Sequence, residues 1–130
     1  MTHAFRLRPG EDLKNEIAAF VKTKKIEAGY IACAVGSLTD YNIRFANQNA
    51  GRKASGHFEI LSLQGTVSIH GLHLHLCIAD GSGLTIGGHL LEGNIIYTTA
   101  EIIIEEIPHM VFTREKDETT GWEEIKIDVR

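Results

Sequence analysis

The chain has 130 residues and a mass of 14.4 kDa, which is the size of one ordinary domain. A hydrophobic content of 43% excludes an intrinsically disordered chain, and two cysteines are too few for a disulfide-stapled scaffold. The formal net charge of −4 and the pI near 5.9 argue against a simple nucleic-acid-binding module, because domains that depend on phosphate contacts usually have a pI above about 9.

The sequence shows no segment that would direct it to a membrane or out of the cell. Its first residues have no apolar signal-peptide core, and no apolar run approaches the roughly 18 residues of a transmembrane helix. Cys33 and Cys77 form no CxxC motif, so we expect two buried, reduced thiols. We therefore expect a cytoplasmic protein without membrane contact.

One amphipathic helix is predicted near the N-terminus, after a short edge strand. Segment 4–8 alternates apolar and basic residues, and Pro9-Gly10 ends it. Acidic residues then open a stretch in which apolar residues recur at helical spacing, and Gly29 is a suitable stop. The prediction is a helix from Glu11 to Ala28.

After Gly29 the periodicity is that of strands. Strands are predicted at 30–35, 41–46, 57–68, 72–79, 85–90 and 95–107, with a closing hairpin at 109–114 and 122–129. About eight strands, one main helix and short connections indicate a single α+β domain with a mainly antiparallel sheet. Two strands are apolar on both faces, which one helix cannot cover, so we expect homo-oligomerisation; closure into a barrel is the alternative.

Segment 71–77 carries the strongest chemical signal, because two of the chain's seven histidines alternate there with leucines. On a strand, successive side chains point to opposite faces, so His73 and His75 share the face opposite the leucines. Two imidazoles at this spacing lie within about 7 Å of each other, in range of one metal ion.

His89 is the candidate third ligand. The turn Asp80–Gly83 is typical of a hairpin, and folding back through it would bring His89 beside His73 or His75. Three neutral imidazoles suit zinc, with iron, nickel and copper as further possibilities, and leave a coordination position open. The alternative is that these histidines line a solvated sheet face or a subunit interface.

The residues around the histidines resemble a known family, the PPC (plants and prokaryotes conserved) domain. The resemblance is carried first by Gly71–His75, Asp80-Gly81 and Gly87–Gly93, in order and spacing. Further matches are Pro9–Asp12, Val35–Leu38, Glu59–Thr66 and Thr99–Glu101. The resemblance runs from about Leu7 to Ile107, before the predicted hairpin at 109–130. It implies one stand-alone PPC domain over residues 1–130.

The resemblance implies a compact, partly closed α+β fold that assembles as a homotrimer. It also implies a fold shared with acetolactate decarboxylase, a zinc enzyme whose metal is held by three histidines, to which His73, His75 and His89 correspond in kind and order. Plant relatives carry the domain behind an AT-hook, a basic Arg-Gly-Arg-Pro element, and prokaryotic members are described as predicted DNA-binding proteins. This chain has no Arg-Gly-Arg-Pro element.

Two functions follow as hypotheses. The first is a trimeric PPC protein with a metal site that is predicted to bind DNA by its family resemblance. The acidic charge and the missing AT-hook are unfavourable to DNA binding. The alternative is a metal-dependent enzyme that acts on a small carboxylated molecule. The residues expected around the metal are Arg44, Glu59, Glu92 and Glu101. Among them, Glu59 is a candidate to orient a ligand histidine, and Glu101 is expected to pair with a basic residue such as Arg44.

Overall fold

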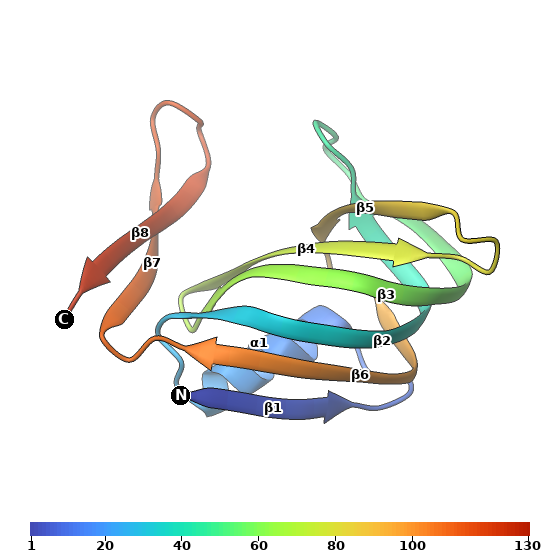
Figure 1. Ribbon diagram of the computed structural model, residues 1–130. Coiled ribbons are helices and arrows are strands. Elements are labelled where there is room, and N and C mark those ends of the chain that lie inside the picture. Colours follow the sequence, from blue (N-terminus) through green and yellow to red (C-terminus); the bar gives the residue numbers. More distant parts are fainter.

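The computed structural model describes residues 1–130 as one helix and eight strands (Figure 1). The elements are β1 (Thr2–Leu7), α1 (Leu13–Thr23), β2 (Gly29–Arg44), β3 (Arg52–Ser68), β4 (Gly71–Ala79), β5 (Thr85–Leu90), β6 (Ile95–Glu106), β7 (Met110–Lys116) and β8 (Glu123–Val129). The α+β class, the number of strands and the single helix are as predicted. That helix is too short and too polar to cross a membrane.

Six strands form one antiparallel sheet in the order β1-β6-β2-β3-β4-β5. The end of β2 also pairs with β5, through Ile43 opposite Leu90 and Arg44 opposite His89. Strands β2, β3, β4 and β5 therefore close into a ring, whereas β6 and β1 extend the sheet beyond it. The partly closed barrel expected from the sequence is confirmed.

Strand β2 is one long strand, whereas the sequence predicted two strands separated at Gly36-Ser37. A β-carbon at Gly36 would lie 2.1 Å from the carbonyl oxygen of Thr99, so this glycine permits a close approach of β2 to β6 and does not end the strand. The register shifts between Leu38 and Asp40, as in a β-bulge, and β2 leaves β6 for β5 beyond it.

Helix α1 is shorter than the predicted segment 11–28. Asp12 caps its N-terminus by accepting a hydrogen bond from the backbone N–H of Asn15. It ends at Thr23 because Lys25 adopts a left-handed conformation, with φ of 55°. The N–H of Ile26 then donates to the carbonyl of Val21, which completes a Schellman motif. The helix thus ends five residues before the predicted end at Ala28.

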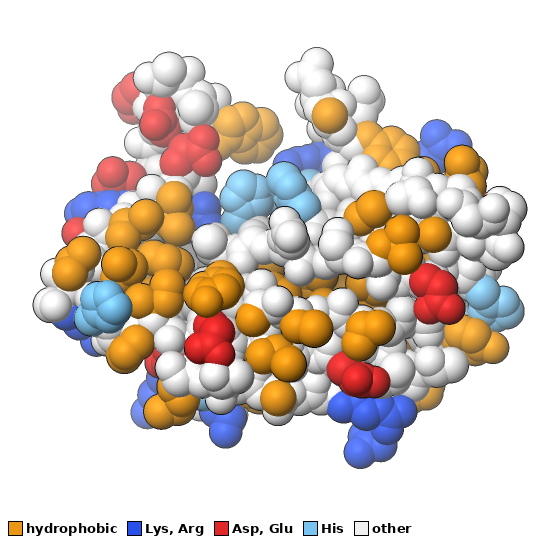
Figure 2. Space-filling view, in the orientation of Figure 1, with side chains coloured by type: hydrophobic (Ala, Val, Ile, Leu, Met, Phe, Trp, Pro, Cys, Tyr) orange, Lys and Arg blue, Asp and Glu red, His pale blue; other side chains and the backbone are white.

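The core lies between α1 and the concave side of the curved sheet (Figure 1). Leu13, Ile17 and Val21 form one buried stripe of the helix and belong to a cluster of 19 buried apolar residues. The opposite face of the sheet stays open, and Figure 2 shows apolar side chains gathered on it. Val35 and Leu61 are 52% and 56% exposed there. Cys33 is also exposed, so the prediction that both cysteines are buried is wrong.

The hairpin β7–β8 forms a separate two-stranded sheet that projects from the main sheet (Figure 1). It is attached through Phe112, which is 7% exposed. The N–H of Phe112 donates to the carbonyl of Glu27, and its carbonyl accepts from the hydroxyl of Ser68. The hairpin is thus anchored to the main domain at its base.

Candidate metal centre

Strands β4 and β5 bring the three predicted histidines together. Leu74 and Leu76 point into the core, so His73 and His75 lie on the outer face of β4. His89 lies directly opposite His75 in the antiparallel pair. One ring nitrogen from each histidine lies within 4.8 Å of the other two. The convergence predicted from the hairpin is therefore present.

The donor set fits a metal ion. In the described chain, none of the three rings makes a hydrogen bond to another protein group, so their nitrogens are available as ligands. Tetrahedral zinc holds nitrogens at about 2.0–2.1 Å, which places neighbouring ligands roughly 3.3 Å apart. His73 and His75 are exposed, so side-chain rotation can bring their nitrogens from the observed separation to that spacing.

The surroundings favour neutral imidazoles, which are the form that binds metal. Burial lowers the pKa of His89 to about 4, and the nearby Arg44 guanidinium is the next cause. Burial is also the main reason that the pKa of His73 lies below its ordinary value, with His75 and then Arg114 acting in the same direction. Both rings are therefore favoured in the neutral form at neutral pH, in which one nitrogen carries no proton and can bind a metal.

Arg44 is the one additional sequence-predicted residue that the structure places beside the histidines. It ends β2 opposite His89, and its guanidinium carbon lies 5.8 Å from the ring centroid of Trp122. This placement depends on Gly88, where a β-carbon would lie 2.5 Å from the carbonyl oxygen of Arg44. The absence of a side chain at Gly88 therefore permits the close approach of strand β2.

The three glutamates proposed around the metal do not line the cavities at the histidines. Glu59 lies opposite Ala79 and lines a different cavity with Ser37. Glu92 is exposed after β5. Glu101 is exposed on β6 opposite Arg6, so its expected pairing with Arg44 is wrong, because Arg44 lies on another part of the sheet.

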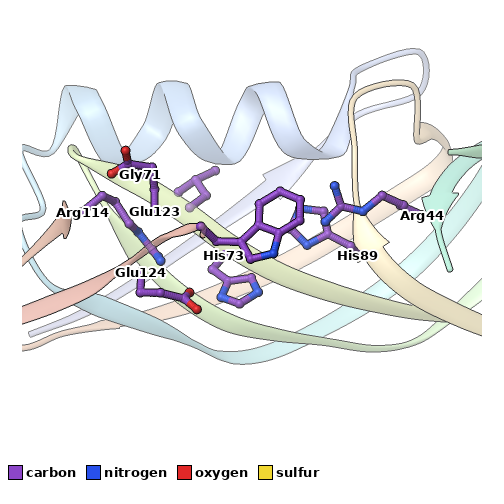
Figure 3. Close-up of a pocket in the computed structure, with 9 residues that line it drawn as sticks. Arg44, Gly71, His73, His89, Arg114, Glu123 and Glu124 are labelled. Atoms are coloured by element: carbon purple, nitrogen blue, oxygen red, sulfur yellow. The ribbon is translucent and has the colours of Figure 1, made fainter. Parts of the chain in front are cut away.

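A cavity of about 410 Å³ adjoins His73 and His89 and is walled by the hairpin β7–β8. Figure 3 shows Arg114 and Arg44 on opposite sides of the two histidines, with Glu124 beside Arg114. The hairpin residues that line this cavity are Arg114, Trp122, Glu123 and Glu124. Sequence reasoning missed all four, because no local pattern shows where a hairpin docks.

A second cavity, of about 570 Å³, also adjoins the cluster. It is lined by the three histidines, Arg44, Trp122 and the segment 45–49 that follows β2. In Figure 2 the histidine side chains occupy the hollow between two projections of the surface, one of which is the hairpin. The candidate ligands are therefore accessible from solvent.

Solved structures with the same fold are known. A hypothetical protein from Salmonella cholerae-suis is 38% identical, with a TM-score of 0.98 and coverage of 100% of this chain and 94% of that one. A metal-containing protein from Archaeoglobus fulgidus is 27% identical, with a TM-score of 0.84 and coverage of 97% and 93%. A protein from Bacteroides thetaiotaomicron, described as a candidate DNA-binding protein, is 22% identical, with a TM-score of 0.85 and coverage of 96% and 91%, and this likeness shows the fold alone.

Among curated proteins, the chain is similar to the bifunctional protein GlmU of two Synechococcus strains. The identity with one of them is 42% over 125 residues, which cover 96% of this chain and 20% of the relative. The chain thus spans about a fifth of the length of the curated relatives it matches. The family model of the Plants and Prokaryotes Conserved (PCC) domain, the PPC domain of the sequence analysis, matches residues 1–108. The chain belongs to this family.

Proposed function

We propose that this domain binds one zinc ion through His73, His75 and His89 and offers the open side of the ion to a small molecule. The observation that carries the proposal is the cluster of three ring nitrogens within 4.8 Å, none of them engaged by another protein group. The Archaeoglobus relative is described as metal-containing, which is consistent with this proposal. Imidazole also binds other divalent transition metals, so zinc is the favoured ion of a set.

Such a centre suits an enzyme that acts on a small carboxylated molecule. When bound by three imidazoles, zinc supplies Lewis acidity at a coordination position that the protein leaves open. The chain's own contribution is to lower the pKa values of His73 and His89, which favours their neutral forms, and to place a fixed positive charge, that of Arg44, beside His89. A guanidinium binds a carboxylate through two parallel hydrogen bonds, so Arg44 can orient the substrate.

The experiment is elemental analysis of untagged protein purified without added metal. Wild type is expected to carry about one zinc ion per chain, and His73→Ala is expected to lose it. His57→Ala is the matched control, because His57 stacks on Tyr97 away from the cluster and should leave the zinc content unchanged. Zinc well below one ion per chain in wild type, or no loss in His73→Ala, would contradict the metal centre.

We further propose that the domain assembles as a homotrimer through the open face of its sheet. Val35 and Leu61 are more than half exposed on that face, and Tyr30 and Tyr97 are 44% and 43% exposed. Val35→Glu is expected to reduce the mass measured by light scattering from three chains to one. Leu84→Glu is the control, because Leu84 is 67% exposed in the β4–β5 turn. A single-chain mass for wild type would contradict the trimer.

DNA binding is the second candidate, supported by the family resemblance and by the description of the Bacteroides structure. The net charge is unfavourable to DNA binding, because a trimer of chains with a charge of −4 each carries −12 and repels phosphates. Fluorescence anisotropy with an A·T-rich duplex at physiological salt tests it. A dissociation constant weaker than about 10⁻⁴ M, the weak limit of non-specific binding, would contradict DNA binding.

We also propose a cytoplasmic location, since the two free cysteines suit a reducing compartment. Cell fractionation tests it, and recovery of the protein in a membrane or secreted fraction would contradict it.

A further inference from the structure

The hairpin β7–β8 is the part of the candidate site that lies beyond the family model. The family model ends at residue 108, whereas four of the nine residues that line the 410 Å³ cavity come from the hairpin. The metal ligands lie within the family model and much of the cavity wall lies beyond it. The hairpin therefore has the position of an element that determines what reaches the centre.

The hairpin β7–β8, which forms one wall of this cavity, is held in place by contacts at its base and at its tip. At the base, Phe112 is tied to Glu27 and Ser68 by backbone and hydroxyl hydrogen bonds. At the tip, the N–H of Asp117 donates to the carbonyl of Trp122 at 2.9 Å. The carboxylate of Asp117 accepts from the N–H of Thr119 at 2.7 Å. The tip is thus a structured turn, and the backbone that carries Trp122 is fixed.

Two guanidinium groups flank the histidines and neither is neutralised by a contact. Arg114 packs over Gly71, where a β-carbon would lie 3.3 Å from its Cγ, and Arg44 lies on the other side beside His89 (Figure 3). No carboxylate lies within 4.0 Å of either guanidinium. Both guanidinium groups therefore remain free to bind an anion.

The charge of the cavity selects the sign of its ligand. Glu123 and Glu124 balance the two arginines in number, so the protein side chains sum to zero with neutral histidines. A divalent ion on the histidines makes the site positive by two. The volume of about 410 Å³, near the lower end of the range for ligand pockets, suits a small molecule.

We propose that the hairpin β7–β8 is a ligand-binding wall of the metal centre, in which Arg114 binds the oxyanion of a small carboxylate or phosphate ligand and Trp122 covers its apolar part. This inference rests on the proposed metal centre. It assigns Arg114 a ligand-binding role and makes the hairpin the element that sets ligand specificity.

The experiment uses Trp122, the chain's one tryptophan, as an intrinsic probe. Zinc-loaded protein is titrated with acetate in one arm and with inorganic phosphate in the other, at constant ionic strength. Tryptophan emission is expected to change saturably with at least one of them, and the tighter anion identifies the ligand class. Arg114→Gln should weaken that binding by about 10-fold or more, the effect of losing a charge-assisted hydrogen bond, and leave the zinc content unchanged.

The control is Arg8→Gln, which removes the same charge from an exposed residue outside the cavity and should bind the anion as wild type does. Arg114→Lys keeps the positive charge but lacks the planar guanidinium, so it should bind the anion with intermediate affinity. This variant tests the proposal if Arg114→Gln folds poorly. Two results would contradict the ligand-binding role of the hairpin and leave the metal centre intact. One is full zinc loading without a saturable response to either anion, and the other is equal anion affinity in the Arg114 variants and wild type. Wild type without zinc would overturn both proposals.

Discussion

His75 and His89 lie directly opposite each other in the β4–β5 pair, with ring centroids 5.9 Å apart. His73 lies two residues before His75 on the same face of β4, and its ring centroid is 5.1 Å from that of His75. Antiparallel register and strand alternation are therefore sufficient to build the cluster. His75 and His89 belong to a strand pair without a register shift, and the cluster should respond to changes in strand pairing.

Zinc is expected to stabilise the folded chain. A ligand that binds only the folded state adds about 2.7 kcal/mol at a free concentration of 100 times its dissociation constant. For a domain of this size, that corresponds to a rise in Tm of roughly 10 °C. Calorimetry with zinc and with EDTA measures the difference. The zinc-dependent rise in Tm should vanish in His89→Ala and persist in His57→Ala. An equal rise in both variants would contradict the assigned ligands.

The metal-free protein should lose stability as the pH falls from about 6.5 towards 4. Burial, followed by Arg44, lowers the pKa of His89 from 6.5 to about 4 in the folded state. Between these values the unfolded chain binds more protons, so the free energy of unfolding rises with pH. Urea unfolding in EDTA over this range measures the slope. His89→Gln should make the slope shallower, and an unchanged slope would contradict the lowered pKa.

Gly88→Ala should weaken the closure of the ring. The new methyl group would meet the Arg44 carbonyl oxygen at 2.5 Å and the Cγ2 of Ile43 at 2.9 Å, so β2 and β5 must separate. We expect a loss of roughly 1–3 kcal/mol, the usual cost of overpacking. Chemical denaturation measures it. Gly81→Ala is the control, because nothing lies within 4 Å of its added methyl, and equal stability of the two variants would contradict the close approach.

Asp12→Ala should destabilise the link between helix α1 and the β5–β6 connection. One carboxylate oxygen of Asp12 caps the helix at Asn15, and the other accepts from the N–H of Gly93 at 2.7 Å. Loss of both acceptors is expected to cost roughly 1–2 kcal/mol. Asp12→Asn keeps one acceptor oxygen and should lose less. Thermal unfolding ranks the variants, and a neutral Asp12→Ala would contradict the dual role.

The sequence was sufficient to predict those features of the fold that depend on local periodicity. Alternation in segment 72–77 separated the leucines from His73 and His75, and the turn Asp80–Gly83 indicated the hairpin that carries His89. The end of α1 was harder to predict, because a lysine, Lys25, adopts the left-handed conformation that usually marks a glycine. The prediction therefore carried the helix on to the next glycine.

The surroundings of the histidines could not be predicted in the same way. Arg44 reaches His89 only because β2 bends past its bulge and pairs with β5, which is a contact between distant parts of the chain. Arg114 and Trp122 depend on where Phe112 docks the hairpin. Glu101 is a candidate by its chemistry alone, and strand pairing places it opposite Arg6, away from the histidines.

The closure between β2 and β5 consists of two residue pairs, Ile43 with Leu90 and Arg44 with His89. The pairing of β4 with β5, which carries His75 and His89, extends over five. A short strand pairing opens at a lower free energy than a long one. The amide hydrogens of the β2–β5 closure should therefore exchange before those of the β4–β5 pairing. Arg44 can then swing away while the β4–β5 histidines keep their register. Warming should therefore weaken the contribution of Arg44 to anion binding before it releases the metal.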